Sequence, residues 1–144
     1  MILNSTYALL ATFGFGILFN IRGRNLIFSC IGGGIGWLVL LIFQQKLNMS
    51  PTFSLFAASI IIGIYSEIMA RILKSPVTTF AVCAIMPMVP GNGMYYTMYE
   101  SVNGNAAKAL STGIQTLVSA GAIAVGIVLV SSGAKIISTK KIHK

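Results

Sequence analysis

Acidic residues are almost absent from this chain of 144 residues. It holds two acids against ten lysines and arginines, and only 8% of the sequence is charged whereas 56% is hydrophobic. Because a soluble domain carries about a quarter charged residues, this composition leaves too little polar surface for a water-soluble globule. The scarcity of acids also leaves no pair of carboxylates for acid–base catalysis.

Residues that bind metals or act as nucleophiles are equally scarce. The single histidine, His143, lies among C-terminal lysines, and the two cysteines, Cys30 and Cys83, lie inside apolar runs, where a thiol packs as a small hydrophobic group. The glycine-rich stretch IGGGIGW lacks the dinucleotide-binding pattern, because position 37 is tryptophan rather than glycine. We therefore expect no enzyme, no metal site and no cofactor.

The basic residues, which give a formal charge of +8, form no patch along the sequence. They lie in short gaps between apolar runs and at the C-terminus, where membrane proteins keep cytoplasmic positive charge. A nucleic-acid partner would need a clustered basic surface. The charge therefore predicts a lipid bilayer, and no nucleic acid, as the partner of this chain.

Five apolar runs approach or reach the length of about 20 residues that a helix needs to cross the hydrocarbon core. They cover residues 2–20, 26–43, 53–70, 77–99 and 109–133. The runs are too long for barrel strands and show no alternation of polar and apolar residues. We predict an all-α polytopic membrane protein, a single integral domain over residues 1–144 with about five transmembrane helices. The first run has no positive n-region or cleavage site and should be a retained helix.

The distribution of basic residues predicts the orientation. If all five runs cross, eight of them lie on one side: Arg22, Arg24, Arg71, Lys74, Lys135, Lys140, Lys141 and Lys144. Only Lys46 and Lys108 fall on the other side. We expect the chain to lie in the inner or plasma membrane of the cell. The positive-inside rule then places the N-terminus outside and the C-terminus in the cytoplasm. The same count favours a true crossing by the fourth run.

A proline- and glycine-rich stretch interrupts the fourth run between Pro87 and Gly93. Pro87 and Pro90 each lack an N–H and clash with the carbonyl four residues earlier, while Gly91 and Gly93 permit unusual backbone angles. We predict that the fourth helix is broken here. Irregular backbone at membrane depth usually lines a path, and a half-helix starting near Gly91 would offer its positive end to a substrate carboxylate. A proline kink that serves only packing is the alternative.

Two polar stripes follow this break at helical spacing. The first is on the fourth run, at Asn92, Tyr96 and Tyr99, and the second is on the fifth run, at Lys108, Thr112, Gln115, Thr116 and Ser119. We expect the two stripes to face each other, or a partner subunit, across a polar cavity open to the outside. As the alternative, the tyrosines belong to an interfacial aromatic belt and the hydroxyls join helices.

The two acids differ in their surroundings. Glu67 lies within an apolar run and is therefore a candidate for ion coupling, although Arg71 one turn later favours a simple ion pair. Glu100 lies at the outer boundary of the fourth run, where we expect it to be solvated. Small residues at Gly32 and Gly36, and at Ala122 and Gly126, are typical of helix faces that pack closely.

Two stretches of the chain resemble the threonine/serine exporter family, in particular its small single-domain components. The stretch that begins at Pro76, PVTTFAVCAIMPMVPGNGMYY, resembles the family's Pro-Leu-Val-Pro-Gly motif and the tyrosine that follows it, with Met88 in place of the leucine. The stretch GFGILFNIRGRNLIFSCIGGGIGWLV is similar to the family's first helix, basic turn and glycine-rich second helix.

This resemblance implies a larger membrane partner of the same family and export of threonine and serine or of dicarboxylates such as succinate. It also implies that Pro87, Pro90, Gly91 and Tyr95 belong to the site, and that an ion gradient drives export. Five helices without an internal repeat are few for a carrier, which independently favours a partner or a homo-oligomer. We predict a transport subunit acting on a small-molecule substrate; the alternative is a non-transporting membrane scaffold or assembly subunit.

Overall fold

The computed structural model describes the backbone of residues 2–142 and the side chains of residues 3–136; His143 and Lys144 lie outside the described residues. Within this range the chain is all-α and contains no strand, as predicted. Its elements are α1 (Ile2–Leu18), α2 (Arg24–Leu41), the π-helical turn η1 (Ile42–Lys46), α3 (Pro51–Leu73), α4 (Val77–Ile85), the 3₁₀ turn η2 (Met86–Met88), α5 (Gly91–Val102) and α6 (Ala106–Ile142). Each predicted apolar run corresponds to one of these helices or, for the fourth run, to the interrupted pair α4 and α5.

Among the described residues, three helical segments are long and apolar enough to cross a membrane: Arg24–Lys46, Pro51–Leu73 and Ala106–Ile136. A fourth is formed if α4–η2 and α5, which meet at a bend of 52°, count as one broken span. The prediction of five crossings is not confirmed. The 17 residues of α1 rise only about 26 Å, which is shorter than a typical hydrocarbon core.

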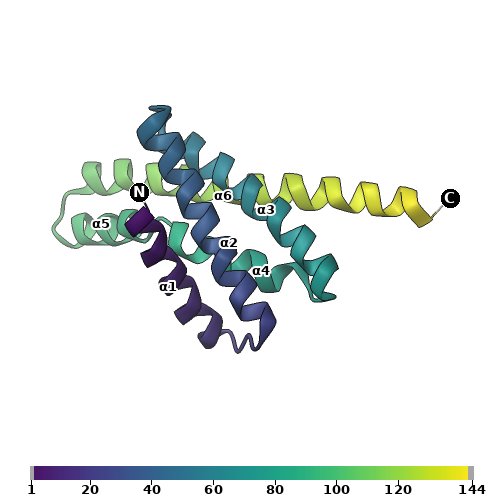
Figure 1. Ribbon diagram of the computed structural model, residues 1–144. Coiled ribbons are helices and arrows are strands. Elements are labelled where there is room, and N and C mark those ends of the chain that lie inside the picture. The colour runs from purple at the N-terminus through teal and green to yellow at the C-terminus, as the bar shows by residue number, and fades with distance from the viewer. Residues whose placement is uncertain (1, 143–144) are drawn as a thin grey trace.

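Helices α1 to α4 form a bundle in which α2 packs against α1, α3 and α4 (Figure 1). The α1–α2 and α3–α4 connections lie at one end of the bundle and the α2–α3 connection lies at the other. Asn25 Nδ2 donates a hydrogen bond to Ser75 Oγ at 2.9 Å, which joins the first two of these connections. The basic residues of the first and third gaps therefore lie at the same end of the molecule.

Glycines set the distance between neighbouring helices. A β-carbon added to Gly32 would lie 2.8 Å from Tyr65 Cε1, and one added to Gly36 would overlap Ile62, so both glycines hold α2 close to α3. Gly126 does the same between α6 and Ser59 of α3. The predicted close packing at these small residues is confirmed, and it follows the rule that small residues let membrane helices approach.

The hydrophobic core lies where α2, α3 and the end of α4 meet. It consists of Leu40, Ala58, Ile62, Ala84 and Met88. Met88 is part of η2 and is only 4% exposed, so the core holds the broken segment in place. A methionine can fill the volume of a leucine at such a position, because swaps that conserve apolar volume are well tolerated.

The C-terminal helix α6 lies across α3 and extends past the bundle on both sides (Figure 1). Its N-terminal part packs against α5, which forms few contacts with any other element. The two helices are joined by residues 103–105 and run antiparallel. This α5–α6 hairpin, residues 91–119, carries most of the residues that the sequence singled out.

Candidate functional site

The helix break lies between Ile85 and Gly91. After Ile85, α4 gives way to the 3₁₀ turn η2, Val89 is extended with φ −57° and ψ 131°, and α5 begins at Gly91. The predicted break is therefore confirmed, but its limits shift toward the N-terminus. The first turn of α5 consists of Gly91, Asn92 and Gly93. A helix can start directly after Pro90 because the first N–H groups of a helix have no earlier carbonyl to bond.

The break leaves two backbone amides at the start of α5 without a helical hydrogen-bond partner. Val89 N donates to Met86 O at 3.3 Å, Gly91 N donates to Val89 O at 2.7 Å, and Met94 N donates to Pro90 O at 3.1 Å, the last being the first hydrogen bond of α5. The amides of Asn92 and Gly93 precede that bond and have no partner within the helix. The helix start thus carries a partial positive charge at the point where the span is bent.

One face of α5, at Gly93, Thr97 and Glu100, lies against α6. A β-carbon added to Gly93 would overlap the side chain of Thr116, and one added to Gly113 would lie 3.2 Å from Thr97 Cγ2. By contrast, a β-carbon added to Gly91 meets no atom within 4 Å. Gly93 is thus required by the packing of the hairpin, whereas Gly91 is not.

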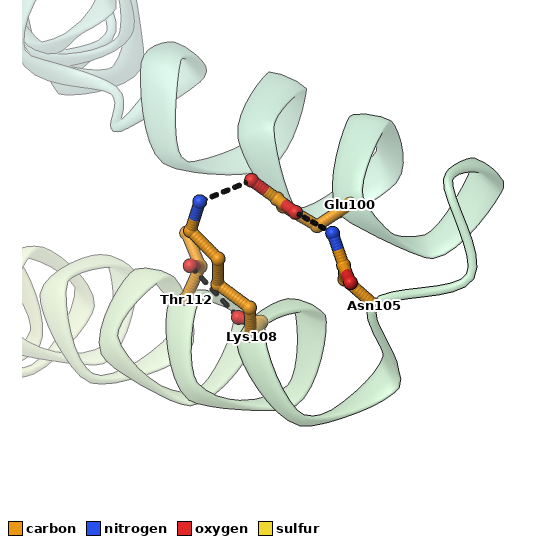
Figure 2. Close-up of polar contacts among 4 residues, drawn as sticks. All are labelled: Glu100, Asn105, Lys108 and Thr112. Atoms are coloured by element: carbon orange, nitrogen blue, oxygen red, sulfur yellow. Dashed lines mark hydrogen bonds and ion pairs between the residues drawn. The ribbon is translucent and has the colours of Figure 1, made fainter.

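Glu100 is held at this interface by two donors from α6 and the preceding turn (Figure 2). Lys108 Nζ lies 2.6 Å from Glu100 Oε1, and Asn105 Nδ2 donates to Glu100 Oε2 at 3.0 Å. Glu100 is only 5% exposed, so the expectation that it is solvated was wrong. The reason is the tight turn at Gly104, whose φ of +78° favours glycine and returns α6 across the end of α5.

Three tyrosines form an aromatic cluster on the exposed part of α5. The rings of Tyr95 and Tyr99 stack with centroids 6.2 Å apart, and Tyr96 meets Tyr95 edge-on at 5.4 Å. Tyr96 lies one turn before Glu100 on α5, and Glu100 pairs with the Lys108 ammonium. The tyrosine cluster and Lys108 therefore share one edge of the hairpin, and Asn92, one turn before Tyr96, is exposed on α5.

The hydroxyls of the α6 stripe bond within their own helix. Thr112 donates to Lys108 O, Thr116 to Thr112 O and Ser119 to Gln115 O, at 3.0, 2.7 and 2.9 Å. They do not join α6 to its neighbours through side-chain hydrogen bonds in the described part of the chain. Gln115 is exposed, whereas Ser119 is buried. The stripe thus divides into a packed side and an open side.

Comparison with known proteins decides the family. A family model described as threonine/serine exporter, ThrE, matches residues 4–132. The chain belongs to the threonine/serine exporter family. No solved structure matches it. Together with the apolar helices, this membership makes the exporter chain a multi-pass membrane protein.

Glu67 and Pro87, which were both predicted for the exporter site, lie outside the hairpin. Glu67 forms the expected ion pair with Arg71, at 3.8 Å, and lines a groove of about 390 Å³ between α3 and the C-terminal part of α6. That groove reaches Gly133, about 38 Å along α6 from Lys108. Pro87 lines a separate cavity of about 280 Å³ with Trp37 and residues of α1.

The sequence did not reveal the role of Glu100 and Asn105 in the exporter. A signal was nevertheless present, because Glu100 and Lys108 are each four residues from Gly104 in the turn sequence VNGN. In an antiparallel helical hairpin, residues equally far from the turn face each other. The pairing could have been inferred from a tight turn at Gly104, but the pattern of apolar residues alone does not define the turn.

The two glycines of the first α5 turn provide a matched test of the hairpin. Replacing Gly93→Ala should destabilise the exporter by about 1–3 kcal/mol, because the new methyl group overlaps Thr116. Gly91→Ala, two residues earlier, should leave the stability unchanged. Thermal unfolding of the purified protein in detergent measures both changes. Adding Thr116→Ala should restore the stability of Gly93→Ala, and a failure of this rescue would contradict the described contact.

Proposed function

We propose that this chain is one subunit of an ion-gradient-driven exporter of small carboxylate-bearing solutes, with threonine and serine or dicarboxylates such as succinate as substrates. The observation that carries the proposal is the helix break, which bends a candidate membrane span by 52° and presents the free amides of α5 at the bend. Broken helices of this kind bind anionic groups of substrates in other carriers. The proposal adds a substrate class, an energy source and a site to the family membership.

The proposed substrate path runs along the exposed edge of the hairpin. Two positive features lie at the ends of α5: the helix start at Gly91 and the Lys108 ammonium opposite Glu100, nine residues and about 14 Å further along. The residues assigned to the path are Pro87, Pro90, Gly91, Asn92, Gly93, Tyr95, Tyr96, Tyr99, Lys108, Thr112, Gln115, Thr116 and Ser119. Of these, Gly93 and Thr116 lie in the contact between α5 and α6, and Ser119 is buried. Glu67, paired with Arg71, is kept as the candidate ion-coupling residue.

A larger membrane subunit of the same family is the proposed partner. Only 11% of the most apolar stretch of α6 is buried, against 39% for α2–η1 and 44% for α3. Within α5, Glu100 is the buried residue, so both helices of the hairpin are largely uncovered. A second subunit, or a second copy of this chain, would cover the hairpin and close one side of the path, which lipid alone cannot line.

We also propose that the C-terminus lies in the cytoplasm and the N-terminus outside the cell membrane. The two basic connections at one end of the bundle support the cytoplasmic assignment of that end. The cytoplasmic position of the α1–α2 and α3–α4 connections does not depend on whether α1 crosses the membrane. Only the side of the N-terminus depends on a crossing by α1.

Efflux from loaded cells tests the transport proposal. Cells loaded with threonine, serine or succinate should release at least one of them faster when this chain and its larger family partner are both present than when either is present alone. Release of the solute into the medium is measured over time. No acceleration, with both proteins confirmed in the membrane, would contradict the proposal and favour a scaffold role.

The same assay tests the site with Gly91→Leu. Because nothing in the chain lies within 4 Å of a β-carbon at Gly91, the larger side chain should leave the amount of protein in the membrane unchanged. It would instead obstruct the proposed path, so efflux should fall at least tenfold. Gly121→Leu, on the open surface of α6, is the matched control and should export normally. Normal efflux by Gly91→Leu would remove the helix start from the path.

The position of the N-terminus can be measured separately. In a variant without the native cysteines, Asn4→Cys places a thiol on the exposed surface of the first turns of α1. A thiol reagent that cannot cross membranes should label it in intact spheroplasts, because the orientation predicted from the basic residues requires α1 to cross. Labelling only after the membrane is permeabilised would show that α1 does not cross.

A further inference from the structure

Both acidic residues of the chain form ion pairs, but only one pair joins two helices. Glu67 pairs with Arg71 one turn away on α3, whereas Glu100 on α5 pairs with Lys108 on α6. The second pair is also the shorter, at 2.6 Å against 3.8 Å. It lies at the edge of the hairpin that carries the tyrosine cluster, so a solute on that edge would meet this pair.

The two partners of this pair differ strongly in their freedom to move. The Glu100 side chain is 7% exposed and the Lys108 side chain is 70% exposed. A lysine carries its charge on a flexible stem with three donors, so an exposed one can turn to another acceptor. Glu100 cannot follow it, because the carboxylate is enclosed between α5 and α6.

Glu100 keeps a second donor when Lys108 leaves. The two carboxylate oxygens have separate partners, with Lys108 at Oε1 and Asn105 at Oε2 (Figure 2). Asn105 belongs to the turn, and its backbone N–H donates a hydrogen bond to the backbone carbonyl of Glu100 at 3.0 Å, which holds the residue in place. Departure of the ammonium therefore leaves Glu100 with a charge-assisted hydrogen bond rather than without any partner.

We propose that Glu100 is an internal competitor for Lys108: in the substrate-free protein the Glu100 carboxylate occupies the ammonium, and the carboxylate of the exported solute displaces it. This inference rests on the proposed function and deepens it, because it names the group that binds the substrate and the group that releases it. The exchange keeps Lys108 paired before and after binding. It also requires a carboxylate on the substrate and excludes neutral analogues.

Competition predicts opposite effects for the two partners. Glu100→Gln removes the competitor, so the solute should bind more tightly and its apparent KM for efflux should fall roughly fivefold or more, the usual range of coupling between sites. Lys108→Gln removes the binding group, so carboxylate efflux should be lost. An ion pair that only holds the hairpin together predicts instead that both variants export less through loss of folded protein.

Swapping the two charged residues distinguishes exchange, in which the substrate carboxylate displaces Glu100, from bracing, in which the ion pair only stabilises the hairpin. The variant with Glu100→Lys and Lys108→Glu retains an ion pair between α5 and α6 but encloses the cation and exposes the anion. Exchange predicts that this variant reaches the membrane in normal amount and does not export threonine. Bracing predicts that it exports normally. The neutral pair, Glu100→Gln with Lys108→Gln, leaves no unpaired charge, so it tests Lys108 even if the single variant fails to fold.

The experiment measures threonine efflux in cells that contain the full chain and its larger partner, for the wild type and these four variants, with the membrane level of each determined in parallel. Threoninol, which has a hydroxymethyl group in place of the carboxylate, should not inhibit threonine efflux by the wild type. Lys46→Gln, an exposed basic residue at the opposite end of α2–η1 from Arg24, is the control and should export normally.

The outcomes distinguish the two proposals. If the wild type accelerates efflux of none of threonine, serine and succinate, the proposed function fails and the exchange fails with it. If the wild type exports but the reversed pair exports equally well, or Glu100→Gln leaves the KM unchanged, the exchange alone is overturned. A lower KM in Glu100→Gln together with no export by the reversed pair is the result we expect.

Discussion

The pairing of backbone polar groups in a medium without water is the constraint on which this structure depends. An uninterrupted helix pairs all its backbone N–H and C=O groups internally. Pro87 and Pro90 prevent a continuous helix between Ile85 and Gly91. The chain responds with a 3₁₀ turn anchored in the core by Met88 and a new helix that leaves at 52°. That change of direction carries α5 away from the bundle, where α6 is the neighbour it packs against. The hairpin, its exposed edge and the ion pair within it all follow from the break.

The chain has only two acidic residues, and each forms an ion pair in a different setting. A chain with formal charge +8 could leave all its basic residues to water and lipid head groups, yet both acids are paired. Glu67 stays within one helix and neutralises a basic residue near the end of α3. Glu100 lies between two helices and sets the position of Lys108 relative to the tyrosine cluster. One ion pair thus lies within α3, and the other joins the two helices of the hairpin beside the proposed path.

Much of the fold could be predicted from the sequence because it depends on local rules. Apolar runs defined the helices, Pro87 and Pro90 defined the break, and Gly32, Gly36 and Gly126 defined close packing faces. What could not be predicted depends on contacts between distant residues. Burial of Glu100 requires the turn at Gly104, and the contact of Gly93 with Thr116 requires the register of two helices. The prediction of five crossings is not confirmed, because α1 is apolar but short. The roles assigned to the path residues stay predictions.

The central claim is that the start of α5 is exposed to a water-filled path, and the reactivity of a thiol at position 92 tests it most directly. In a variant without the native cysteines, Asn92→Cys should react with a thiol reagent that cannot cross membranes, and an excess of threonine should slow the reaction. Val125→Cys, on an exposed apolar part of α6, provides the rate for a position facing lipid. If Asn92→Cys reacts no faster than Val125→Cys, whether or not the larger subunit is present, the break does not line a path and the account is contradicted.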